Sequence, residues 1–193
     1  DTVARVPDRM RARAALPIAE AALEAGRVDL ADALTSMVAR VEPGPPDGDQ
    51  MLDVLLARVD FARGEWRSAE ALLFPLLGRE TPAGVEAMIR LVEFRAERGA
   101  RPPKGLAETM EAIAFSQGAS AIGRRLLAAA AQARAMGEGI RPALAALSTL
   151  AAKAGDRPQA EQAARDMLID YDPDPAEAAA FAEAALAHWD LVG

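Results

Sequence analysis

The residues of this chain that could do chemistry begin with its single histidine, His188, which stands next to Trp189. One histidine cannot supply a two-imidazole metal site, and a Ser-His-Asp triad needs a serine elbow that the sequence lacks. The absence of cysteine excludes disulfides, thiolate nucleophiles and cysteine-based zinc or iron sites. We therefore expect His188 to be an exposed or packing residue and not a catalytic one.

Three aspartates at alternate positions, Asp170, Asp172 and Asp174, are spaced as carboxylates around a calcium ion can be. Counted from Asp170, the sixth position of an EF-hand loop holds Pro175 where glycine is needed. The twelfth holds Phe181 where a bidentate glutamate is needed. Asp174 followed by Pro175 instead predicts the capped start of a helix. We expect neither a metal ion nor a cofactor.

A phosphate-binding loop and a pair of catalytic carboxylates are also missing from the sequence pattern. The turn 137–139 is the nearest approach to a glycine cluster, and it lacks the Lys-Ser/Thr pair of a P-loop. The acidic residues are scattered along helical stretches without a pairing that predicts general acid–base chemistry. These observations predict that the protein is not an enzyme.

The charge and hydropathy of the chain exclude two further classes of function. The formal net charge is -7, whereas a nucleic-acid-binding protein needs a concentrated basic surface. No uncharged apolar run approaches the roughly 18 residues that a membrane helix requires. A cysteine-free chain suits the periplasm and the cytoplasm equally, and Asp1 in place of methionine is compatible with a removed leader.

The hydrophobic rhythm is helical nearly throughout, and no stretch alternates apolar and polar residues as a strand does. We therefore expect an all-α fold in one continuous domain, 1–193, with 174–191 as a C-terminal capping helix. The expected helices cover about 8–25, 28–41, 49–63, 65–77, 82–98, 104–115, 119–136, 141–154, 156–169 and 174–189.

Local signals mark several of these helix ends. Pro17 is expected to bend the first helix or to mark its true start. Thr81 before Pro82 predicts an N-cap followed by proline at the first helical position. Asp156 followed three residues later by Gln159 is the pattern of a capping box.

One unit recurs along the chain: a helix, a turn glycine and a second helix. In most copies an alanine follows five residues after the glycine, where the second helix is expected to cross closest to the first, while after Gly99 the same place holds Lys104. Trp66, two residues after a turn glycine, is expected to pack between adjacent hairpins. The predicted turn glycines are Gly26, Gly64, Gly99 and Gly155, and the alanines that follow are Ala31, Ala69 and Ala160.

In these units the chain resembles the tetratricopeptide repeat family. The residues that carry the resemblance in the best unit are Leu56, Ala57, Gly64, Trp66, Ala69, Leu73 and Leu76. In the next best they are Leu144, Leu147, Gly155, Ala160, Met167 and Pro173, and in a weaker first unit Ile18, Ala19, Gly26, Ala31, Val38 and Pro43. The stretch from Gly99 to Gly139 departs from the pattern, and an alternative pairing there joins the helix over 119–136 to the helix over 141–154.

The resemblance implies a right-handed α-solenoid of about five hairpins that binds a protein or peptide partner on a concave face lined by the first helix of each hairpin. It implies a non-enzymatic scaffold or assembly factor; the alternative is a spacer or oligomerisation domain of a larger bacterial envelope or motility protein. The mixed-charge residues of these faces would suit a basic or amphipathic partner segment. The implied partner-binding residues are Arg13, Glu20, Glu24, Arg58, Phe61, Glu93, Glu97, Thr149 and Lys153.

Overall fold

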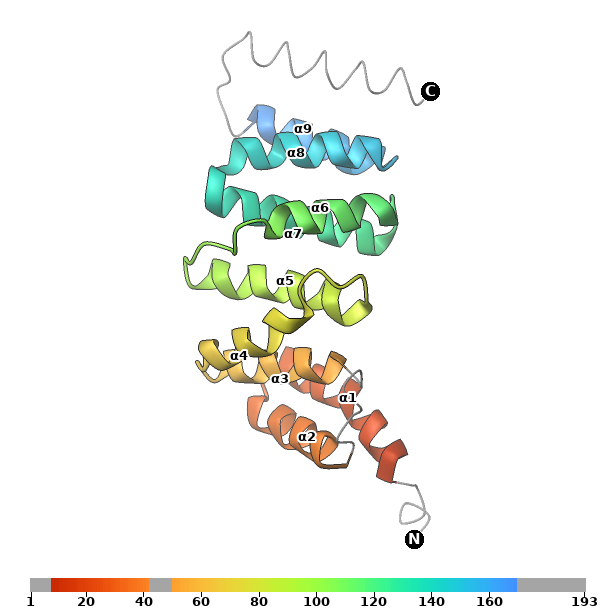
Figure 1. Cartoon of the computed structure of the whole chain (residues 1–193), viewed down its shortest axis with the longest axis vertical. Helices are drawn as coiled ribbons and strands as arrows, with labels where there is room; N and C mark the ends of the chain where they lie inside the picture. The colour runs from red at the N-terminus through yellow and green to blue at the C-terminus, as the bar shows by residue number, and fades with distance from the viewer. Residues whose placement is uncertain (1–7, 42–49, 170–193) are drawn as a thin grey trace. The chain divides into compact units, whose positions relative to one another are not determined.

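The computed structural model describes residues 8–41 and 50–169, and the regular elements of these ranges are all helical (Figure 1). The predicted all-α class is confirmed. His188, the aspartates at 170, 172 and 174, and the predicted capping helix lie outside the described residues. The α-helices are α1 (Asp8–Glu24), α2 (Val28–Val41), α3 (Gln50–Ala62), α4 (Trp66–Leu73), α5 (Pro82–Glu97), α6 (Leu106–Gln117), α7 (Ala121–Glu138), α8 (Ile140–Lys153) and α9 (Arg157–Ile169).

The helices form two compact units, the first ending at Arg90 and the second beginning at Leu91, within α5. In the first unit α1 packs on α2, and α3 packs on α4. In the second unit α6 packs on α7, α7 on α8, and α8 on α9, as Figure 1 shows for the α6–α7 and α8–α9 pairs. Each unit is therefore built from antiparallel helical hairpins. A single domain over 1–193 stays a prediction.

Two predicted helix ends are wrong for local reasons. The helix expected to reach about Leu77 ends at Leu73 and continues as a 3-10 turn over Phe74–Leu76, because Pro75 cannot donate a helical hydrogen bond. The helix expected from Lys104 begins at Leu106, since Gly105 is left-handed with φ of 82°. Pro17 lies inside α1 and does not mark its start.

Side-chain caps hold the starts of three helices. The hydroxyl of Thr81 accepts the N–H of Gly84 at 3.2 Å, which confirms the cap predicted there. Asp156 accepts the N–H of Gln159 at 3.4 Å, but the amide of Gln159 donates instead to the carbonyl of Arg124, so the capping box is half formed. Ser120 caps α7 by accepting from Gly123, which the sequence analysis did not predict.

The small residue five positions after the turn glycine is buried in each predicted copy that has one. Ala31 and Ala69 are 0% exposed and Ala160 is 1% exposed. The turn glycines have positive φ, 82° at Gly64, and their hydrogen-bond pattern ends the first helix. Alanine lets the two helices of a hairpin approach closely where a larger side chain would collide. The packing role inferred for these alanines agrees with this burial.

A further hairpin, which the glycine and alanine pattern did not single out, turns at Gly118, while Gly99 has the positive φ (63°) and the turn hydrogen bonds of the other predicted turn glycines. Gly118 has φ of 57°, α6 and α7 pack on either side of it, and Gly123 stands buried five residues later. This hairpin therefore also buries a small residue five positions after its turn glycine, here glycine in place of alanine. Its second helix, α7, begins three residues after the turn glycine, one residue later than the second helices of the other hairpins. A search for alanine at this place does not find the copy. The alternative pairing predicted between the helices over 119–136 and 141–154 is confirmed, because α7 packs on α8 as well as on α6.

The core of each unit consists mainly of aliphatic and methionine side chains, and the second unit also buries Phe94. Burying one such side chain fully contributes about 1.5–3 kcal/mol. In α1 the side chains of Ala15, Ala19 and Ala22 are buried, whereas Ile18, one of the residues that carry the resemblance, is 54% exposed. The largest fully buried side chains include Leu73, Met88, Leu91, Met110, Leu126 and Leu127.

Candidate interaction surface

The first helices of the first unit are joined by an ion pair between predicted site residues. Arg58 on α3 donates to the carboxylate of Glu20 on α1 at 3.1 Å. The Arg58 side chain is 13% exposed while that of Glu20 is 52% exposed, so the carboxylate stays open to solvent on one side. The structure therefore brings Glu20 and Arg58 together. The resemblance placed both of them on the partner-binding faces of first helices.

We expect Glu20 and Arg58 to be coupled by about 0.5–1 kcal/mol, because one partner is shielded and the other exposed. A double-mutant cycle with Glu20→Ala and Arg58→Ala, read by urea unfolding, measures this coupling. Additive effects of the two substitutions would contradict it. The exposed neighbour Glu24 supplies the control, since a Glu24→Ala, Arg58→Ala cycle is expected to be additive.

Helix α5 presents a narrow polar stripe, and most of its other residues from Ala83 to Phe94 are buried. Glu86, Arg90, Glu93 and Glu97 recur at spacings of four, three and four, which places them on one face of the helix. Arg90 bonds Glu86 at 2.8 Å, Glu93 is half-buried and Glu97 is exposed. The two predicted site glutamates of α5 therefore share a face, at the C-terminal end of this stripe.

The other predicted site residues are placed as follows. Phe61 is half-buried on α3. On α8 of the second unit, Lys153 is exposed, and Thr149 uses its hydroxyl locally to bond the carbonyl of Ala145 at 2.9 Å. Arg13 lies in α1, and its side chain is outside the described residues. Their role in partner binding stays a prediction.

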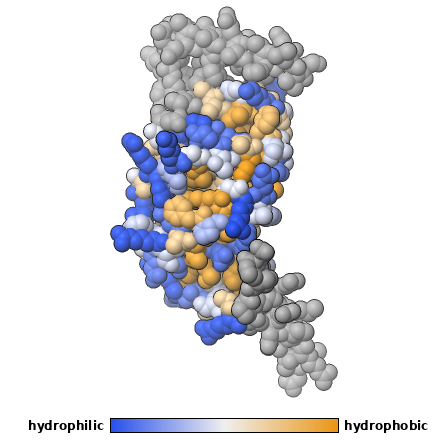
Figure 2. Space-filling model, in the orientation of Figure 1, coloured by the Kyte–Doolittle hydropathy of each residue, from blue (hydrophilic) through white to orange (hydrophobic). Residues whose placement is uncertain are grey.

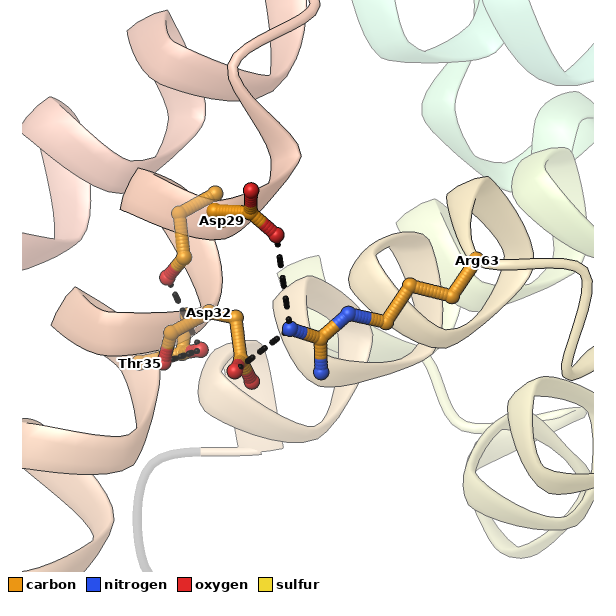
Figure 3. A network of polar contacts seen from close by, with 5 residues as sticks. Asp29, Asp32, Thr35 and Arg63 are labelled. Atoms are coloured by element: carbon orange, nitrogen blue, oxygen red, sulfur yellow. Dashed lines mark hydrogen bonds and ion pairs between the residues drawn. The ribbon is translucent and has the colours of Figure 1, made fainter.

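A polar network that the sequence analysis did not find joins α2 to the end of α3 (Figure 3). Arg63 bonds Asp32 at 2.8 Å and lies 3.9 Å from Asp29, one turn earlier on α2. Thr35, 0% exposed, satisfies its hydroxyl on the carbonyl of Ala31 at 3.0 Å. The signal for this network in the sequence is the i, i+3 spacing of Asp29 and Asp32, which places both on one face of α2. The network fixes α2 against α3.

A second polar cluster lies where α7 meets the α8–α9 turn. Asp156 is 3% exposed, and its Oδ2 is 3.6 Å from Nε of Arg124, too far for a hydrogen bond. The Oε1 atom of Gln159 is buried without a hydrogen-bond partner. Asp156 and Gln159 cap α9 and link it to α7, and of the three side chains only Asp156 is buried, while Arg124 is 53% exposed.

Large apolar side chains also reach the surface between charged ones (Figure 2). None of them belongs to the predicted site, because a sequence pattern assigns apolar residues to the core by default. Isolated exposed apolar residues are normal on protein surfaces. The most exposed ones among the described residues are Ile18, Phe115, Phe74, Ile122 and Met37.

The turn between α3 and α4 forms a shallow depression that is open to solvent, lined by residues 64–68. Trp66 is half-buried there, and the guanidinium of Arg67 lies over its ring, 4.9 Å from the centroid. Across the turn, Ser68 donates to Asp60 at 2.5 Å. An open depression of this kind does not enclose a small molecule as a ligand cleft does.

Within the ranges 8–41 and 50–169, no group of three or more acidic or histidine side chains is placed to hold a metal ion. No helix in the described part of the chain has the length and apolar character to cross a bilayer. Comparison of the chain with models of protein families, with curated proteins and with solved structures gives no match.

Proposed function

We propose that this protein is a non-enzymatic interaction module, a scaffold or assembly factor that holds a segment of a partner protein. In this proposal the hairpins continue as a right-handed, tetratricopeptide-like α-solenoid, and the partner lies along the first helices of the hairpins. The repeated burial of a small residue beside each hairpin turn supports the proposal. Because the residues beside the turns are needed for packing, the residues on the exposed helix faces are the ones that can differ between repeats and bind a partner.

The charges on these faces suggest the chemistry of the partner. Among the side chains of α1 that the structure describes, the exposed acidic ones are Glu20, held by Arg58, and Glu24. On α5 the polar stripe ends in Glu93 and Glu97. A partner segment with lysine or arginine beside apolar residues would complement these surfaces, and rim charges of this kind act mainly on specificity and association rate.

The test is to place a photo-crosslinking amino acid at Phe61 and, as a control, at Met37 on the second helix of the first hairpin. The partner is then identified by mass spectrometry. We expect crosslinks from position 61 and not from position 37. Equal crosslinking from both positions would contradict binding along the first helices.

Charge reversal at Glu93 and Glu97, the C-terminal end of the polar stripe of α5, is tested in the same crosslinking assay. Glu93→Lys with Glu97→Lys is expected to lower the yield about tenfold, because two attractive contacts become repulsive. Glu65→Lys with Glu80→Lys makes the same change of charge at exposed residues in the turns and serves as the matched control. Circular dichroism of each variant verifies that it is folded. An unchanged yield in the folded Glu93, Glu97 variant would refute the proposed surface.

A further inference from the structure

The connection between α5 and α6 departs from the rule that the hairpin turns follow. Where the other turns bury a small residue five positions after the glycine, Lys104 is exposed here. The connection is also longer and contains Pro102 and Pro103. Helix packing therefore does not account for the residue types of this segment.

Basic side chains gather at this connection. Between residues 95 and 104 the chain has four basic residues, Arg95, Arg98, Arg101 and Lys104, and one acidic residue, Glu97. Arg95 precedes Glu97 by two residues, which places it on the opposite face of α5 from the polar stripe, and Arg98 follows the end of the helix. The last three of the basic residues are exposed.

The backbone that carries these cations is held in place. The N–H of Ala100 donates to the carbonyl of Arg95 at 2.8 Å, and the guanidinium of Arg95 donates to the carbonyl of Arg101 at 2.7 Å. Pro103 accepts the N–H of Leu106 at 3.2 Å, and the two prolines restrict φ. A preorganised segment loses little entropy when a ligand binds to it.

The charge of the chain as a whole is unevenly distributed. Of its 29 acidic residues six lie in 170–193, where there is no lysine or arginine, so 1–169 has 23 acidic residues against all 22 basic ones. Against this nearly neutral background, the ten residues from 95 to 104 have a net charge of +3. A local positive surface attracts a short acidic ligand through the nearby charges.

We propose that the α5–α6 connection is a docking site for an acidic peptide segment of a partner protein, contacted by Arg98, Arg101 and Lys104. This surface is distinct from the polar stripe of α5, and the proposal does not depend on the function proposed above. A nucleic acid is a poorer fit, because a polyanion needs a longer basic track and the protein has a net charge of -7. The prolines present the cations on a fixed backbone, which suits an extended peptide.

The test measures fluorescence anisotropy of a short dye-labelled peptide of alternating Glu and Ser with the full chain at low salt. Arg101→Glu with Lys104→Glu is expected to weaken binding about tenfold, because two attractive charges become repulsive. Arg27→Glu with Arg79→Glu makes the same change of charge at exposed arginines of the first unit and is expected to change affinity less than about twofold. Equal weakening by both pairs, or no measurable binding by the folded wild-type chain, would overturn the proposal.

Two further arms identify the occupant. In the first, Asp170→Asn, Asp172→Asn and Asp174→Asn are combined in the full chain. Unchanged peptide affinity supports an external partner, while a severalfold rise would show that the chain's own acidic segment occupies the site and would overturn the proposal. In the second, an oligonucleotide of the same length competes with the peptide, and tighter binding of the oligonucleotide would overturn the choice of a peptide.

Discussion

Ala69→Leu is expected to destabilise the protein by about 2–3 kcal/mol, because Ala69 is 0% exposed in α4, where it packs next to α3. The added carbons have no free volume to enter, so the two helices must separate or the side chain must take a strained rotamer. Thermal unfolding followed by circular dichroism measures the effect, and a loss of this size lowers the melting temperature by about 5–10 °C in a chain of this length.

Two substitutions to leucine serve as controls for Ala69→Leu. Ala71 is exposed in the same helix, so Ala71→Leu is expected to change stability by less than about 0.5 kcal/mol. Lys104 occupies the same place after Gly99 but is exposed, so Lys104→Leu is expected to be equally mild. If Ala69→Leu were as mild as these, the buried alanine would not be the point of closest approach in the hairpin.

Gly123→Ala is the second substitution with a large expected effect. A Cβ at this position would lie 2.2 Å from the carbonyl oxygen of Gly118 and 3.2 Å from that of Ala114. Both neighbours are backbone atoms that cannot rotate away, so α7 must shift relative to its own turn. We expect a loss of about 2–3 kcal/mol in the free energy of unfolding, measured by urea denaturation.

Gly137→Ala is the matched control, because it is the same substitution in the same helix. No atom lies within 4 Å of a Cβ built at Gly137. Alanine there is expected to stabilise the chain by about 0.5–1 kcal/mol through its higher helix propensity. Opposite signs for the two variants would confirm that Gly123 is required for close approach. A gain in stability at both positions would show that α7 adjusts freely at its start.

Gly84 and Gly123 have the same local environment at the start of a helix. Each stands three residues after a hydroxyl cap, Thr81 or Ser120, and donates its N–H to that hydroxyl. At both glycines an added Cβ would meet a backbone carbonyl five residues earlier in the chain, at 2.3 Å for Gly84. The sequence pattern of a cap followed by glycine was visible, but only the folded backbone shows why alanine cannot replace the glycine.

The polar contacts between helices are the part of the candidate site that the sequence could not predict. Arg58 and Glu20 are 38 residues apart, and Arg63 and Asp32 are 31 residues apart. No local rule connects residues at such separations, and each charge has several partners of opposite sign along the chain. The register between hairpins selects among them, so the sequence can show that Asp29 and Asp32 share a face, but only the structure shows that Arg63 pairs with them.

The sequence by itself determined the helical class, most helix ends and the hairpin turns at Gly26, Gly64 and Gly155, since periodicity, capping and positive φ act over a few residues. The tertiary structure decided that α6 and α7 form a hairpin about Gly118, that α7 also packs on α8 as one of the two predicted pairings had it, and that Ile18 is exposed. These outcomes depend on which faces meet across helices, and close packing fixes that through contacts between residues distant in the chain.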